Sequence, residues 1–289
     1  MSLSKTLRQN RWRYLSLVAG FFLFVGPFAF LARGLNYLTG NMAQATAHTL
    51  CLRMPVDWLF GGRWLALLGS VAALFILVVV GIALFAGPAF CGWLCPVGGI
   101  SEGLSRAVPL PERFRLRIKD PSVTTGLRYG FFIGFIAVSV IVAYRLAAMS
   151  SVCCRYCSTS VMQNLVDGAI GNTIAVTYWS TGAIISLFAW LVVGGIAMSG
   201  GRGWCLFFCP VGALSGISHR IGRRLNMYGI SFHQHACKDC TTCQVSCPTW
   251  AVREDRTVNP NLCIVCKECV NGCPNGSYQY GKERDDLAR

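Results

Sequence analysis

Charged residues are scarce in this chain of 289 residues, and acidic ones are the scarcest. Asp, Glu, Lys and Arg together make up 13% of the sequence, against 54% hydrophobic residues, and the mean hydropathy is +0.49. This composition excludes an ordinary soluble domain and is typical of a membrane protein. The sequence contains no Walker A motif, no GxGxxG fingerprint and no CxxCH. It therefore gives no sign of ATP-driven chemistry, NADH-driven chemistry or covalently attached haem.

Four apolar segments are long enough, or nearly so, to cross a membrane as helices. They run over residues 14–32, 64–90, 129–144 and 168–201. The third is the shortest, and Arg128 and Arg145 at its ends are expected to snorkel to the two interfaces. The first follows a basic start without a clear cleavage site, which indicates an uncleaved anchor. We therefore predict a membrane all-α four-helix bundle made of two tandem helical hairpins.

The positive charge is unevenly distributed along the chain. The net charge is +14, but the residues after 235 carry seven basic and seven acidic side chains. With four spans, one side of the membrane would hold fourteen Lys and Arg in residues 1–13, 91–128 and 202–235, against five in residues 33–63 and 145–173. The positive-inside rule then predicts a multi-pass protein of the bacterial inner membrane with both termini in the cytoplasm. Because the charge explains topology, no nucleic-acid partner is expected.

Two cysteine runs near the C-terminus have the same spacing. Residues 237–248 read CKDCTTCQVSCP and residues 263–274 read CIVCKECVNGCP. Each is the C-x2-C-x2-C-x3-C-P run of bacterial ferredoxins with two [4Fe–4S] clusters, in which the fourth cysteine completes the other cluster. The predicted ligand sets are Cys237, Cys240, Cys243 and Cys273 for one cluster, and Cys263, Cys266, Cys269 and Cys247 for the other. Two zinc sites are the alternative, but zinc does not require two identical four-cysteine runs.

A second cysteine motif, CxxxCP, occurs twice in the apolar part of the chain. FCGWLCPVGG at residues 90–99 is repeated as WCLFFCPVGA at residues 204–213. The two cysteines of each pair share a face if the preceding helix continues through them, and Pro96 and Pro210 favour the end of that helix. The duplication predicts one site on the cytoplasmic face, close to the ferredoxin clusters. Its members are Cys91, Cys95, Cys205 and Cys209.

Four thiolates in this CxxxCP site suffice for a further [4Fe–4S] cluster or for one tetrahedral metal ion. Docking beside the ferredoxin clusters is another interpretation. The plainest one is that the cysteines pack as small apolar residues.

The predicted outer loops contain four more cysteines, which are Cys51, Cys153, Cys154 and Cys157. On an oxidising face the plain interpretation is one or two disulfides. An outer metal or cluster site and an exchange-active Cys154–Cys157 pair are the alternatives.

The order of four spans, two CxxxCP motifs and a double ferredoxin run resembles the NapH/MauN-type polyferredoxin membrane proteins. That family includes the membrane quinol dehydrogenase component of the periplasmic nitrate reductase system and an accessory protein of methylamine utilisation. The resemblance implies an electron carrier that takes electrons from the membrane quinone pool and passes them towards a periplasmic oxidoreductase such as nitrate reductase. It also implies a partner iron–sulfur or cytochrome electron carrier. The outer cysteines are not expected from it.

The expected domains are a basic N-terminus at residues 1–13, a membrane domain at residues 14–225 and a C-terminal 2[4Fe–4S] ferredoxin-like α+β domain at residues 226–289. Two other functions remain open. They are an accessory ferredoxin-type role in methylamine utilisation, and an assembly or redox-sensing role for a periplasmic metalloenzyme.

Overall fold

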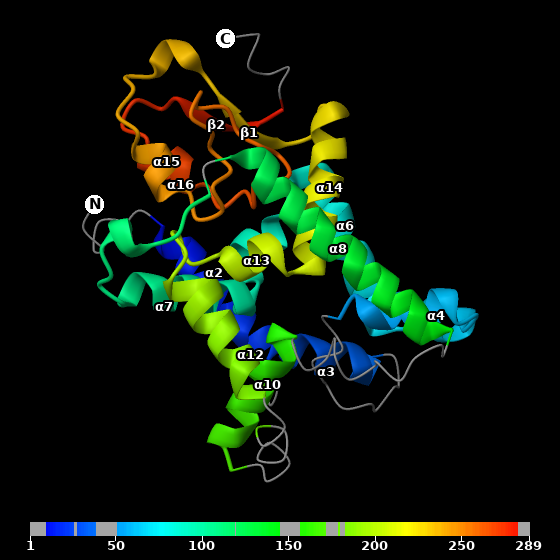
Figure 1. Ribbon diagram of the computed structural model, residues 1–289. Coiled ribbons are helices and arrows are strands. Elements are labelled where there is room, and N and C mark those ends of the chain that lie inside the picture. Colours follow the sequence, from blue (N-terminus) through cyan, green and yellow to red (C-terminus); the bar gives the residue numbers. More distant parts are fainter. Residues whose placement is uncertain are drawn as a thin grey trace.

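The computed structural model describes residues 10–25, 28–38, 51–118, 120–144, 157–171, 179 and 183–282. Most of this chain is helical. Figure 1 shows the C-terminal tail gathered against α2 and α7, whereas α3, α4 and α10 lie away from it. The first part of the chain contains α2 (Arg11–Phe24), α3 (Phe30–Leu38), α4 (Arg53–Phe60), α5 (Trp64–Leu68), α6 (Val71–Ala86), the π-helical turn η2 (Phe90–Leu94) and α7 (Pro96–Ala107).

The second part of the chain repeats the same order of an apolar helix, a cysteine-containing turn and a helix that begins at proline. Its elements are the 3-10 turn η3 (Glu112–Phe114), α8 (Pro121–Ala143), α10 (Ser158–Ala169), α12 (Ile184–Phe188), the π-helical segment η5 (Ala189–Ile196), α13 (Gly203–Phe207) and α14 (Pro210–Arg224). Helices α6 and α14 lie side by side (Figure 1).

The tail is a small α+β unit. It consists of β1 (Gly229–Phe232), the 3-10 turn η6 (Gln234–Ala236), α15 (Thr242–Ser246), α16 (Glu268–Gly272) and β2 (Tyr278–Gly281). The two strands are antiparallel, with Gly229 opposite Gly281 and Phe232 opposite Tyr278. The rings of Phe232 and Tyr278 lie 5.2 Å apart, and such a cross-strand aromatic pair stabilises a two-stranded sheet.

Among the described residues, α8 is the one helix long and apolar enough to span a membrane. Two shorter apolar helices run over residues 71–86 and 184–196. The predicted first span is interrupted between Phe24 and Phe30, and Pro27, which we expected to kink it, lies outside the described residues. The second is divided before α6, where the Ser70 hydroxyl accepts a hydrogen bond from the Ala73 amide as an N-cap.

The expectation that Arg128 snorkels to a membrane interface is wrong. Helix α8 begins at Pro121, seven residues before Arg128, because the Asp120 carboxylate caps the Ser122 amide and proline suits the first helical position. Arg128 is therefore inside the helix and only 4% exposed. Its guanidinium donates to the carbonyls of Asn261 and Gly212 instead. Arg145 lies outside the described residues.

The prolines of the CxxxCP motifs have a different role from the predicted one. The helical turns before them do end, at Leu94 and at Phe207, but Pro96 and Pro210 each begin a new helix. A proline at the first helical position costs no hydrogen bond because its missing N–H would have no partner there. Since the helix is not continuous, Cys95 and Cys209 are N-cap residues rather than helical neighbours of the preceding cysteines.

The tail contacts the first CxxxCP turn through its backbone. The Trp93 indole donates a 2.9 Å hydrogen bond to the Val265 carbonyl. At the adjacent Gly92, a Cβ atom would lie 2.2 Å from the carbonyl oxygen of Ile264. Because this position has no room for a side chain, the tail and the first CxxxCP turn approach backbone to backbone.

We expect Gly92→Ala to push the tail away from this turn. Overpacking of a close contact costs about 1–3 kcal/mol, so the unfolding temperature should fall and the tail should become sensitive to protease. Gly103→Ala in α7 is the matched control, because a Cβ there meets nothing within 4 Å. Equal unfolding temperatures for the two variants would contradict the close contact.

Candidate iron–sulfur sites

The two ferredoxin-type runs have the same local backbone. In the first run Asp239 and Thr241 have φ values of 51° and 57°, and in the second Val265 and Lys267 have 52° and 62°. These residues occupy equivalent positions, 26 residues apart. Left-handed backbone is uncommon outside glycine, so its repetition indicates that both loops are wound in the same way. In each run, one left-handed residue lies between the first and second cysteines and the other between the second and third.

The structure brings together the cysteines of each predicted tail set. Cys237, Cys240, Cys243 and Cys273 all line one cavity, together with Tyr278 and Arg256. In the other set, the thiol of Cys269 interacts with those of Cys247, Cys263 and Cys266. The fourth cysteine of each run therefore lies with the other run, as the spacing predicts for a two-cluster ferredoxin. Ligation of clusters by these residues stays a prediction.

The two tail sets differ in exposure. In the first set Cys240 is exposed, Cys237 and Cys273 are half-buried and Cys243 is buried, whereas every cysteine of the second set is buried. The first set is thus near the surface of the protein, and the second is in its interior.

Backbone amides donate hydrogen bonds to the cysteine sulfurs. The amides of Ala251 and Ser277 donate to Cys247 and Cys273, at 3.2 and 3.4 Å, and these pairs are again equivalent in the two runs. Such N–H···S bonds favour a thiolate ligand and help to set the potential of an iron–sulfur centre. In the CxxxCP site, the Gly212 amide donates to the Cys209 sulfur at 3.4 Å in the same way.

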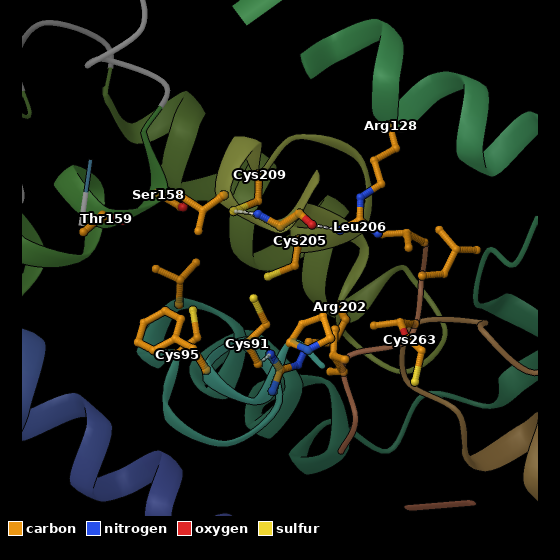
Figure 2. Close-up of a pocket in the computed structure, with 18 of the residues that line it drawn as sticks. Cys91, Cys95, Arg128, Ser158, Thr159, Arg202, Cys205, Leu206, Cys209 and Cys263 are labelled. Atoms are coloured by element: carbon orange, nitrogen blue, oxygen red, sulfur yellow. Dashed lines mark hydrogen bonds between the residues drawn. The ribbon is translucent and has the colours of Figure 1, made fainter. Parts of the chain in front are cut away.

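The four CxxxCP cysteines line a single cavity, as the duplication predicts. Cys91, Cys95, Cys205 and Cys209 surround it from the two repeats. Figure 2 shows their sulfur atoms turned toward a common space. Cys263 of the tail also lines this cavity, but its own sulfur points away (Figure 2). The CxxxCP cavity and the buried tail set are therefore neighbours.

The size of the CxxxCP cavity favours a group of several atoms over a single ion. Its volume is about 60 Å³, against roughly 10–15 Å³ for one water molecule. Over the described part of the chain, no three His, Cys, Asp or Glu side chains are close enough to hold one metal ion. The four thiols, the N–H···S bond and the volume fit an iron–sulfur cluster.

Burial raises the pKa of Cys91 and of Cys209 to about 12. Thiols with such a pKa are protonated at neutral pH, so an iron-containing group would have to displace those protons on binding.

A network of buried ion pairs joins α2, α7, the second CxxxCP repeat and the tail. Glu102 of α7 accepts from Arg13, at 2.6 Å, and from Arg202, at 2.7 Å. Arg106 pairs with Glu102 and with Glu268, at 2.8 and 2.6 Å, and Arg13 also pairs with Glu268. Glu102 and Arg13 are at most 1% exposed. The network therefore joins α7, which follows the first CxxxCP motif, to Glu268, which precedes Cys269.

The charges of this network shift the acidity of Glu102. Burial alone would raise the pKa of its carboxyl, but Arg13, Arg202 and Arg106 outweigh burial and hold the pKa well below its usual range. Glu102 is therefore ionised at every physiological pH.

Sequence reasoning missed these buried arginines and glutamates. One signal was available, because Asp57 and Glu102 are the only acidic residues before position 112. An isolated acid just after a CxxxCP motif, in a chain rich in arginine, indicates a specific partner. The partners themselves depend on tertiary contacts that the sequence does not reveal.

The outer cysteines are only partly described. Cys51 and Cys157 are half-buried, and Cys153 and Cys154 lie outside the described residues. Cys157 precedes α10, whose first residues Ser158 and Thr159 line the CxxxCP cavity. The disulfide expectation stays a prediction.

Comparison with known proteins supports the iron–sulfur assignment. A family model described as a 4Fe-4S binding domain matches residues 68–118 and 182–227. The two matched segments contain the two CxxxCP motifs. Both segments lie before the C-terminal cysteine runs.

Several relatives are ferredoxin-type or electron transport proteins by name. The chain is 24% identical to the ferredoxin-type protein NapH of Escherichia coli (strain K12), over 92% of this chain and 88% of NapH. It is 27% identical to the methylamine utilization ferredoxin-type protein MauN of Methylorubrum extorquens, over 63% of this chain and 53% of MauN. It is 25% identical to YccM of Escherichia coli (strain K12), whose name proposes a role in electron transport, over 72% of this chain and 55% of YccM. No solved structure matches the chain.

These matches support an iron–sulfur electron-transfer role. The resemblance to NapH/MauN-type ferredoxin-type proteins is confirmed at modest identity. The chain spans only about half the length of MauN and YccM.

We expect Glu102→Gln to destabilise the protein by about 3–5 kcal/mol, because it leaves buried guanidinium groups without their shared carboxylate. Glu112→Gln is the control, since Glu112 is 61% exposed and 3.8 Å from Arg115, and should cost less than about 1 kcal/mol. Because the folded pKa of Glu102 is lowered, its contribution is present at neutral pH and is lost only as the pH falls below the usual range of a glutamate. Chemical unfolding at several pH values measures both effects, and equal stability of the two variants at neutral pH would refute the network.

Proposed function

We propose that this chain is a membrane iron–sulfur electron carrier that takes electrons from membrane quinol and passes them towards a periplasmic oxidoreductase. The observation that carries the proposal is the convergence of twelve cysteines in three groups, one at the surface, one buried and one between the two CxxxCP repeats. Closely spaced sites of this kind suit a one-electron relay, and the named relatives support an electron-transfer role.

The residues of the three groups have distinct tasks in this proposal. Two [4Fe–4S] clusters are held by the tail sets, which are Cys237, Cys240, Cys243 and Cys273, and Cys263, Cys266, Cys269 and Cys247. A third is held by Cys91, Cys95, Cys205 and Cys209. When bound, such clusters supply one-electron oxidation and reduction. The N–H groups of Gly212, Ala251 and Ser277 orient the sulfurs, and the apolar residues around the buried set exclude water.

The membrane arrangement is part of the proposal. Four spans are assigned to residues 14–32, 64–90, 129–144 and 168–201, flanked by cytoplasmic residues 1–13 and by a cytoplasmic tail at residues 226–289. Exposed apolar side chains on the helices support a lipid-facing surface. They include Leu15, Val18 and Phe22 of α2, Leu74, Leu77 and Phe85 of α6, Phe131 and Ile133 of α8, and Ile184, Ile185 and Phe188 of α12.

A role in assembly or redox sensing for a periplasmic metalloenzyme, or in methylamine utilisation, is the second candidate. The match to MauN favours the latter. Quinol-dependent reduction of the clusters separates the carrier from an assembly factor, which would show metal or cluster transfer instead.

Purified full-length protein should contain about twelve iron atoms and as many acid-labile sulfides per chain, because each of three [4Fe–4S] clusters contributes four. The Cys91→Ser/Cys205→Ser variant should lose about four irons and quinol-dependent electron transfer. Cys240→Ser, which changes only the exposed tail set, should lose tail iron and keep the iron of the CxxxCP site.

Loss of transfer with unchanged iron in the double variant would assign the CxxxCP cysteines to docking. If neither changes, these cysteines only pack. Stoichiometric zinc without sulfide would overturn the tail assignment as well.

Reporter fusions test the membrane arrangement. Fusions after Arg106 and Arg289 should be active as cytoplasmic reporters, and a fusion after Met54 as a periplasmic reporter, because the basic segments stay inside. A periplasmic signal from the fusion after Arg289 would contradict the proposed topology.

A further inference from the structure

Two buried arginines form part of the wall of the CxxxCP cavity. Arg128 comes from α8, and Arg202 lies just before α13. Arg128 is 4% exposed and Arg202 is fully buried. Figure 2 shows Arg202 beside Cys91 and Arg128 beyond Cys205. Buried charges are rare unless they are paired, so each of these side chains requires a counter-charge.

Arg128 has no carboxylate partner among the residues that the structure describes. Its guanidinium donates to two backbone carbonyls, those of Asn261 at 2.7 Å and of Gly212. Its Nε is buried and has no hydrogen-bond partner. Carbonyl oxygens satisfy N–H groups, but they do not neutralise the positive charge.

Arg202 has a carboxylate partner that it shares. Its Nε donates to Glu102 at 2.7 Å and its Nη1 to the Cys91 carbonyl at 2.7 Å, while Nη2 is buried without a partner. The single charge of Glu102 also serves Arg13 and Arg106. The wall of the cavity is therefore positive overall.

This positive wall faces the four thiols. Arg128 interacts electrostatically with Cys91, Cys205 and Cys209, and Arg202 with Cys205 and Cys95. A neutral quinone or four protonated thiols would leave the arginines uncompensated, which is unfavourable in the protein interior. An iron–sulfur cluster with four thiolate ligands is anionic and would compensate them.

We propose that Arg128 and Arg202 are positioning residues that hold an anionic, four-thiolate iron–sulfur group in the CxxxCP cavity and raise its reduction potential. The inference rests on the proposed function, which puts a cluster in this cavity. Reduction adds a negative charge, so nearby fixed positive charges favour the reduced form. The two arginines would make this centre easier to reduce than the same four thiolates in a neutral cavity.

The test compares Arg128→Gln, which keeps hydrogen-bond donors but removes the charge, with Arg128→Lys, which keeps the charge. Redox titration followed by EPR gives the midpoint potential of the CxxxCP centre, which is identified by its loss in the Cys91→Ser/Cys205→Ser variant. At a fixed ambient potential, the reduced-to-oxidised ratio in Arg128→Gln should fall by about tenfold or more, which corresponds to a shift of about 59 mV for one electron. Arg128→Lys should stay near wild type.

Two further variants serve as a control for net charge and as an independent test. Arg113→Gln removes an exposed arginine and should leave the midpoint unchanged, which controls for net charge. Arg202→Gln removes the second charge without touching the Asn261 and Gly212 carbonyls, and should lower the midpoint even if Arg128→Gln does not fold. Selective loss of the CxxxCP iron in the Gln variants, with tail iron kept, would also support the proposal.

The proposal is overturned if Arg128→Gln and Arg202→Gln keep both the CxxxCP iron and the wild-type midpoint. A failure of the proposed function looks different, because wild-type protein would then contain no iron beyond that of the tail.

Discussion

Buried arginines are the main electrostatic constraint on the interior of this protein, because each of them requires a negatively charged partner. Arg13, Arg202 and Arg106 all pair with Glu102. Arg13 and Arg106 also pair with Glu268 in the tail. Removing charges from water is expensive unless partners are close and hydrogen-bonded. Glu102 and Arg106 pair within α7, but Arg13, Arg202 and Glu268 gain their partners only when the segments that supply them come together.

This constraint explains how the tail is placed against α2 and α7. Glu268 immediately precedes Cys269, and Glu102 is part of the helix that begins at Pro96, so the network fixes the buried tail set relative to the first CxxxCP turn. Gly92 allows the backbones to touch at the same place. Cys263 belongs to the tail and also lines the CxxxCP cavity. Three groups of cysteines are thereby held in sequence from the surface to the helix ends.

The sequence pattern predicted which cysteines lie together, but not the helix boundaries or the buried arginines. The duplicated spacing predicted that the four CxxxCP cysteines would meet, because two copies of one motif in a duplicated fold occupy equivalent places. It also predicted which tail cysteines would lie together. Apolar runs did not predict helix boundaries. Asp120 caps α8 so that the helix begins before Arg128, and Ser70 caps α6 within the second predicted span. The role of Arg128 depends on carbonyls of Asn261 and Gly212, far away in sequence, so no local pattern could indicate it.

We propose above all that the CxxxCP cavity holds an iron–sulfur cluster, beside two clusters proposed for the tail. An anomalous-scattering map of the full-length, anaerobically purified protein at the iron edge tests it most directly, because it locates iron without relying on activity. The account predicts three compact iron peaks, one of them enclosed by Cys91, Cys95, Cys205 and Cys209. Two peaks confined to the tail, with no iron between the CxxxCP cysteines, would contradict it.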